Sequence, residues 1–130
     1  MKASKKSQYG LRAMVYLARI AKEKRVCPLK EVSQKEGIPF DFLEKIISEL
    51  EKEGLVKAKK GVRGGYFLAK PAKEITAGKI VGILEGGIAP VSCVGCPISR
   101  KCSTKSVWSE VQESLDSTLD SITLEDLIKR

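Results

Sequence analysis

Apolar residues recur along most of this chain at the three- and four-residue spacing of helices that bury one face. The first run predicts a helix over residues 8–24, with Ser7 as its N-cap. The pattern continues in a short helix over residues 28–36 and in a third helix that ends near Glu53. Gly37 between the last two suits the left-handed end of a helix. Such a pair is typical of a helix-turn-helix, although many other helical proteins also contain helix-glycine-helix pairs.

The segment after the third helix changes from helical to alternating periodicity. Residues 55–59 alternate as a strand does, residues 61–65 form a glycine-rich turn, and residues 66–69 can return as the partner strand before Pro71 ends it. A hairpin in this place is the wing of a winged helix-turn-helix, and the alternative is an ordinary solvated hairpin. The predicted fold is therefore mainly α-helical, with a small β-hairpin wing.

The C-terminal part predicts three more helices. The first covers residues 76–85 with Thr76 as its cap, and the last begins after a capping arrangement at Thr123. The long helix between them begins near Ser103 or Thr104 and carries one narrow apolar stripe, consisting of Trp108, Val111, Leu115, Leu119 and Ile122. A narrow stripe on a long helix favours packing against a second copy. We expect a DNA-binding domain over residues 1–72, and a cysteine loop with dimerisation helices over residues 73–130.

Charge is distributed unevenly along the 130 residues. The net charge is +8, but residues 1–70 hold 17 Lys and Arg against 8 Asp and Glu, whereas residues 71–130 hold 7 against 8. The basic excess lies where the helix-turn-helix is predicted, as expected for a polyanion-binding surface. No stretch is apolar enough to span a membrane, so we expect a cytoplasmic protein without a membrane partner. The chain has no histidine, which removes the usual general base and argues against an enzyme.

Four cysteines are the other distinctive feature. Cys93, Cys96 and Cys102 are clustered, whereas Cys27 precedes an apolar helix start and is expected to be a small buried residue. Clustered cysteines in a reducing compartment indicate metal or redox chemistry rather than structural disulfides. An iron–sulfur cluster, a zinc site and a thiol/disulfide switch all remain open. A thiol–disulfide exchange enzyme is less well suited, because its motif normally follows a strand in a βαβ fold.

Several segments together resemble one known family, the IscR/NsrR/CymR type of bacterial winged-helix regulators. They span essentially the whole chain: residues 9–18, 29–54, 62–71, 75–76, the cysteine loop, Trp108 and residues 123–124. The wing sequence of residues 62–71 is the most specific of them. The resemblance implies a homodimer held by the long helix that binds a pseudo-palindromic DNA operator, with an iron–sulfur cluster in some members and none in others. Cluster-free members respond to a partner protein, which is the alternative mode of control.

The resemblance also implies ligands for a 2Fe-2S or 4Fe-4S cluster. Cys93, Cys96 and Cys102 match the three cysteines of the cluster-bearing members, with the same five residues between the second and third. This chain departs from the pattern in two ways. Only two residues separate Cys93 from Cys96, whereas the resemblance implies about five residues at this place in many members of the family. Lys105 stands where IscR-like members have a histidine, and Gln8 lies near the acidic ligand of NsrR-like members. The fourth position is open to another carboxylate, Cys27, water or nothing.

Base contacts are expected from the exposed first turns of the third helix. The candidates there are Phe40, Asp41, Phe42, Glu44 and Lys45, although either phenylalanine can instead pack under the turn. Lys59, Lys60 and Arg63 are expected to contact phosphates and the minor groove from the wing.

Overall fold

The first helix begins earlier than the periodicity predicts. The computed structural model describes residues 2–86 and 103–130, and its first helix, α1, spans Lys5–Ala21. The N-cap is Ser4, whose side chain accepts the backbone N–H of Ser7 at 3.2 Å. The prediction of Ser7 as the cap was therefore wrong: Ser7 lies inside the helix and is 1% exposed.

A carboxylate from a distant part of the chain explains this beginning. Glu85 accepts hydrogen bonds from the backbone N–H of Ser4 at 2.9 Å, from the Ser4 hydroxyl at 2.6 Å and from the Ser7 hydroxyl at 2.5 Å. These bonds, those of the Ser4 side chain first, lower the pKa of Glu85. A negative charge at a helix N-terminus is also stabilised by the helix dipole. The three bonds extend α1 by one turn and fix its beginning.

The helix-turn-helix consists of α2, Leu29–Glu36, and α3, Phe40–Lys52. Pro28 is the N-cap of α2 and so lies just before its first turn. Gly37 ends α2 with φ 65°, the left-handed conformation that the sequence predicts there. The hydroxyl of Ser33 donates to the carbonyl of Ile38, which closes the turn, and Ile38 itself is buried. The turn therefore has a defined geometry and fixes α3 relative to α2.

The predicted wing is an antiparallel hairpin of β1, Val56–Lys59, and β2, Gly65–Leu68. Its register pairs Val56 with Leu68 and Lys59 with Gly65. The other edge of β2 is also occupied, because Cys27 and Tyr66 exchange two backbone hydrogen bonds, of 2.9 Å and 2.7 Å. A Cβ atom on Gly65 would lie 2.4 Å from the carbonyl oxygen of Cys27. Only glycine allows the two backbones to approach this closely.

Beyond the hairpin lie the 3₁₀ turn η1, Ala72–Glu74, and helices α4, Ala77–Glu85, α5, Lys105–Asp120, and α6, Leu124–Ile128. Thr76 caps α4 and Thr123 forms a capping box at α6, as the sequence predicts. Backbone hydrogen bonds join the two capping segments, from Ala77 to Ile122 at 2.7 Å and from Leu124 to Ile75 at 2.9 Å. The C-terminal helices are thus attached to the domain that carries the wing.

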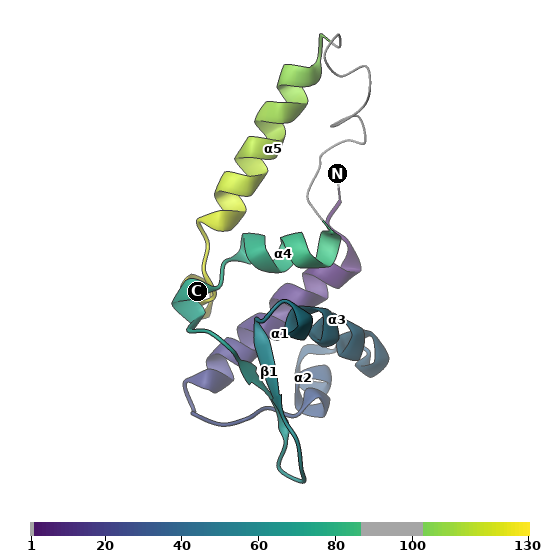
Figure 1. The fold of residues 1–130 in the computed structure, drawn as a ribbon, viewed down its shortest axis with the longest axis vertical. Coiled ribbons are helices and arrows are strands. Elements are labelled where there is room, and N and C mark those ends of the chain that lie inside the picture. Colours follow the sequence, from purple (N-terminus) through teal and green to yellow (C-terminus); the bar gives the residue numbers. More distant parts are fainter. Residues whose placement is uncertain (1, 87–102) are drawn as a thin grey trace.

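One core holds these elements together. Helix α1 contacts α2, α3, α4, α6 and β2, and its buried side chains include Met14 and Leu17. Figure 1 shows the hairpin projecting from one end of the molecule and α5 from the other. No residue of α5 is fully buried, and its contacts within the chain are mainly with α4. In the part of the chain that the structure describes, no helix is long and apolar enough to cross a membrane.

The close approach at Gly65 generates a stability prediction. Replacing Gly65 by Ala should lower the free energy of unfolding by about 2 kcal/mol, because the added methyl group overlaps the rigid backbone at Cys27. Gly82→Ala is the matched control. A Cβ atom there has no neighbour within 4 Å, so alanine should stabilise α4 by about 0.5–1 kcal/mol. Thermal and chemical unfolding measure both, and equal stability of the two variants would contradict the packing at Gly65.

Candidate DNA-binding surface

Helix α3 has one buried face and one open face. Leu43, Ile46, Ile47 and Leu50 are all fully buried, which fixes the rotation of the helix about its axis. The opposite face exposes Asp41, Glu44, Lys45 and Ser48 to solvent. A groove of about 890 Å³ runs along this face, bordered also by Lys6 of α1 and Tyr66 of β2. The side chains predicted to read bases are therefore accessible from the first turns of α3.

The two predicted phenylalanines of α3 lie in different environments. Phe40 is 42% exposed at the first position of the helix. Phe42 is half-buried, and its ring meets that of Tyr9 edge to face, with 5.6 Å between centroids and 82° between planes. This geometry is favourable for aromatic pairs. Phe42 therefore contributes to the packing of α3 on α1, whereas Phe40 is free to contact a ligand.

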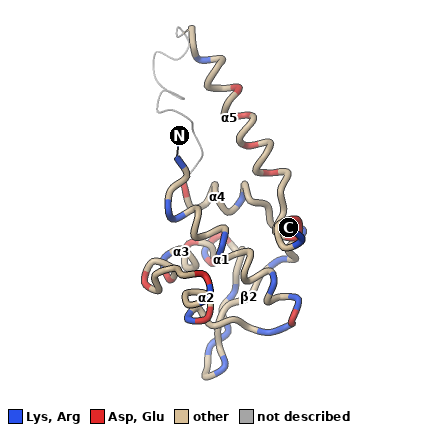
Figure 2. The backbone as a smooth tube through the Cα atoms, turned by 180° about the vertical axis from the view of Figure 1, so that it is seen from behind, with Lys and Arg blue, Asp and Glu red and all other residues tan. Residues whose placement is uncertain are grey.

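Positive charge is concentrated on the wing rather than on α3. Lys59, Lys60 and Arg63 are all exposed, and so is Lys57, which lies two residues before Lys59 on the same side of β1. Figure 2 shows this basic segment at the hairpin end and the acidic bands along α5. Lys57 was not among the predicted DNA contacts, although the i, i+2 alternation of a strand places it on the same side as Lys59. None of these four cations takes part in an ion pair among the described residues.

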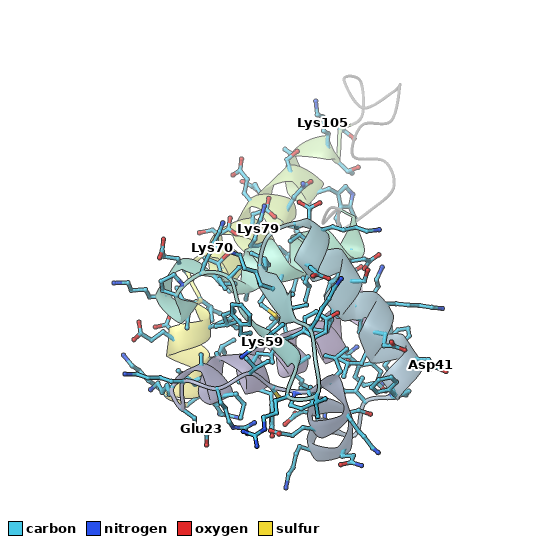
Figure 3. The ribbon with its side chains drawn as sticks, turned by 60° about the horizontal axis from the view of Figure 1, so that its bottom comes forward. Glu23, Asp41, Lys59, Lys70, Lys79 and Lys105 are labelled. Atoms are coloured by element: carbon cyan, nitrogen blue, oxygen red, sulfur yellow. The ribbon has the colours of Figure 1, made fainter. Side chains whose placement is uncertain are left out.

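The helix and the hairpin lie at the same end of the molecule. Figure 3 views this end, with Lys59 near the centre and Asp41 at the beginning of α3 to one side. The open face of α3 is nearly balanced in charge, with Asp41 and Glu44 against Lys45. It is therefore poorly suited to attract phosphates by itself. A basic hairpin beside an accessible helix face is an arrangement suited to a nucleic acid, because cations can pair with phosphates while a helix presents side chains to base edges.

Comparisons with known proteins agree with this arrangement. A family model described as "Rrf2: Iron-dependent Transcriptional regulator" matches residues 3–130. The chain belongs to the Rrf2 family. It is 35% identical to Protein rrf2 of Nitratidesulfovibrio vulgaris over 133 residues, which cover 99% of this chain and 88% of that protein. The predicted winged-helix fold is confirmed by the solved structures of IscR and CymR that this chain resembles.

Two solved structures resemble the Rrf2 chain described here. The structure of T. potens IscR is similar with a TM-score of 0.83 and 38% identity, covering 99% of this chain and 87% of that one. CymR of B. subtilis, described as the global cysteine regulator of that organism, is similar with a TM-score of 0.83 and 36% identity, covering 99% and 97%. The Rrf2 family consists of transcriptional regulators, so the prediction that the protein is not an enzyme is confirmed.

The three cysteines predicted as metal ligands in this Rrf2 protein, Cys93, Cys96 and Cys102, lie outside the described residues. Within residues 2–86 and 103–130, no group of three or more His, Cys, Asp or Glu side chains is placed to hold a metal ion. Cys27 is a free thiol and fully buried, as predicted. Burial, followed by the nearby Glu31 carboxylate, raises its pKa to about 12. The thiol is therefore protonated at neutral pH, which makes it a poor nucleophile and a poor metal ligand.

The contrast between Phe40 and Phe42 can be tested by substitution. Phe42→Ala should lower the free energy of unfolding by about 1–3 kcal/mol, because the edge-to-face contact with Tyr9 and part of the core are lost. Phe40→Ala should change it by less than about 0.5 kcal/mol, since that ring is largely in solvent. Chemical denaturation measures both. If Phe40→Ala proved to be the more destabilising change, the orientation of α3 would be wrong.

Proposed function

We propose that this Rrf2-family transcriptional regulator binds a DNA operator through α3 and the wing, as two copies related by a two-fold axis. The observation that supports this most directly is the exposed first turns of α3 beside a hairpin that carries Lys57, Lys59, Lys60 and Arg63. In this proposal Phe40, Asp41, Glu44 and Lys45 contact base edges in the major groove, as does Phe42 where its packing allows. The site of action is then the cytoplasm, where the operator lies.

The wing is proposed to supply affinity. Lysines neutralise phosphates at any sequence, whereas an arginine at a hairpin tip can enter a narrow minor groove and favour A·T-rich segments. Arg63 stands between Gly61, which has φ 115°, and the close-packed Gly64. Of the residues next to Arg63 at the tip, only Val62 carries a side chain, and that side chain is fully exposed.

Removing the tip charge tests this role. Arg63→Ala should weaken binding to an operator selected from random duplexes by about 1–3 kcal/mol and leave unfolding unchanged. Lys129→Ala removes one positive charge after α6, away from the hairpin, and should have little effect. Fluorescence anisotropy at several salt concentrations measures both. Affinity that does not change between low and moderate ionic strength would contradict the electrostatic contribution.

The second copy is proposed to pack on α5. Trp108, Val111, Leu115 and Leu119 of the predicted stripe lie on α5 and are only half-buried within one chain. Ile122 was wrongly placed on this helix: α5 ends at Asp120, and the carbonyl of Ile122 accepts the N–H of Ala77. Val107 is 50% exposed, and an open groove of about 440 Å³ runs beside Val111, Leu115 and Leu119. Apolar surface of this kind on a projecting helix is typical of an interface between copies. A dimer would present two α3 helices to half-sites about 34–36 Å apart or a multiple of this distance.

A charge in the centre of this stripe should prevent association. Leu115→Asp is expected to give monomers with much weaker operator affinity, because a carboxylate would be buried between the two copies without a partner. Glu113→Gln changes the charge on another face of α5 and should leave the dimer intact. Analytical ultracentrifugation distinguishes the two. A parent protein that sediments as a monomer both free and on DNA would contradict the dimer.

We further propose that Cys93, Cys96 and Cys102 make the regulator responsive to an iron–sulfur cluster. Three thiols within ten residues are the donor type that such clusters require, and the family model itself is described as iron-dependent. When bound, a cluster supplies a redox-sensitive group whose gain or loss can bias a two-state equilibrium and so change operator affinity. Residues 1–72 would then bind DNA, and residues 73–130 would respond to the gain or loss of the cluster. Zinc, a thiol/disulfide switch or a partner protein are the alternative signals.

Anaerobic reconstitution tests the cluster directly. The parent protein should take up iron and sulfide, show visible absorption and change its operator affinity. Combined Cys93→Ser, Cys96→Ser and Cys102→Ser substitutions should remove all three effects. Cys27→Ala is the control and should retain them, because that thiol is fully buried with a raised pKa. If the triple variant took up as much iron as the parent, or the parent took up none, zinc or a thiol/disulfide switch would replace the cluster.

A further inference from the structure

The wing is attached to the rest of the protein at a second place besides its own two strands. The segment between α1 and α2 runs alongside β2, where Cys27 and Tyr66 exchange backbone hydrogen bonds of 2.9 Å and 2.7 Å. Gly65 lies against the same segment without room for a side chain. Any displacement of residues 25–27 would therefore displace β2. The position of the hairpin relative to α3 therefore depends on this segment as well as on the direct connection between α3 and β1.

A single carboxylate holds the segment to both neighbouring helices. Glu31, in the first turn of α2, accepts two hydrogen bonds from the guanidinium of Arg25, at 3.0 Å and 2.7 Å. It also accepts one from the hydroxyl of Tyr16 in α1, at 2.6 Å. Arg25 in turn donates to Glu23 at 2.9 Å. Bidentate pairing of this kind fixes orientation as well as distance.

The hydrogen bonds among Arg25, Glu31 and Tyr16 also change the pKa values of these side chains. The hydrogen bonds from Arg25 and then Tyr16 lower the pKa of Glu31 to about 2. Burial, followed by the bond to Glu31, raises the pKa of Tyr16 to about 12. Glu31 is consequently ionised and Tyr16 protonated at neutral pH, as the hydrogen bonds require. The bonds to the Glu31 carboxylate would weaken as the pH falls through its lowered pKa, and the Tyr16 bond would be lost as the pH rises through the raised pKa of Tyr16.

These contacts are better suited to positioning than to stabilising the fold. The side chains of Arg25 and Glu31 are 42% and 25% exposed, and ion pairs near the surface contribute about 0–1 kcal/mol to stability. The core under them, which includes Val32 and Met14, is formed independently by apolar side chains. Loss of Glu31 should therefore loosen residues 25–27 and the attached hairpin while α1, α2 and α3 remain folded.

We propose that Glu31 is a positioning residue for operator binding, which sets the place of the wing relative to α3 by fixing residues 25–27 to α1 and α2. The proposal rests on the proposed function, since it assigns to the wing a role in DNA binding. Glu31 contacts no DNA in this scheme. Its effect on affinity passes through the hairpin and therefore through Arg63.

A double-mutant cycle tests this dependence. Glu31→Ala should weaken operator binding about tenfold in the parent background, but by much less when Arg63 is already replaced by Ala, because a displaced wing no longer brings Arg63 to the DNA. Glu31→Gln, which keeps an acceptor for Arg25 and Tyr16, should restore part of the affinity. Glu74→Ala in η1 removes an exposed carboxylate outside the described ion pairs and should have no effect in either background. If the loss of affinity in the double variant equals the product of the losses in the two single variants, the two residues act independently and the proposal is overturned.

A measurement without DNA separates this proposal from the proposed function. Hydrogen exchange of the Tyr66 amide, which is bonded to the Cys27 carbonyl, should be at least about tenfold faster in Glu31→Ala than in Glu74→Ala, with the α3 amides unchanged. Should Glu31→Ala fail to fold, Tyr16→Phe removes one of the three bonds and is expected to act in the same direction. Unchanged exchange at Tyr66 in a folded variant would overturn the positioning role. Failure of the parent protein to bind any operator would instead overturn the proposed function.

Discussion

The buried face of α1 positions α3, the hairpin and α4, and α5 is joined to this group through α4. Ala13, Met14 and Leu17 are in contact with no solvent or almost none, and the helix to which they belong packs against α2, α3, α4, α6 and β2. A polar contact at the surface of α1 also helps to orient α3, because Lys6 pairs with Glu49 of α3 at 2.6 Å. Helix α3, the hairpin and α4 therefore pack against the same helix, whereas α5 is attached through α4. A displacement of α1 would therefore move α3, α4 and β2 as well.

In the proposed function, affinity for DNA and the reading of its sequence are divided between the hairpin and α3. The open face of α3 carries Asp41 and Glu44 as well as Lys45, so it attracts phosphates weakly and depends on specific partners at base edges. The hairpin carries lysines and Arg63, which attract any nucleic acid. The proposal needs both elements, because lysines pair with phosphates at any sequence and the open face of α3 carries two carboxylates against one lysine. In the proposed function, operator affinity therefore depends on the position of the hairpin relative to α3. The Arg25–Glu31–Tyr16 group lies where it can fix that position.

Local patterns predicted most of the fold. The apolar spacing identified α3 with its buried Leu43, Ile46, Ile47 and Leu50, and glycine chemistry identified the turn at Gly37. The cap at Thr76 and the capping box at Thr123 were equally local. These features are decided by neighbours within four residues, which a sequence displays directly.

Contacts between distant residues could not be predicted in this way. Ser4 rather than Ser7 caps α1 because Glu85, far along the chain, completes the site. The pairing of Cys27 with Tyr66 and the packing against Gly65 depend equally on tertiary structure. The burial of Cys27 was predicted, because the residue lies just before an apolar helix start and a free cysteine packs as a small apolar residue. The roles of Cys93, Cys96 and Cys102 remain predictions, since those residues lie outside the described part of the chain.

A hydroxyl-radical footprint of the protein on a selected operator tests the central claim most directly. Two copies that each use α3 and the wing should protect two segments related by a two-fold axis, with centres about one helical turn, or a multiple of it, apart. Minor-groove protection by the wings should accompany each half-site. A single protected segment, or protection that does not depend on sequence, would contradict the account.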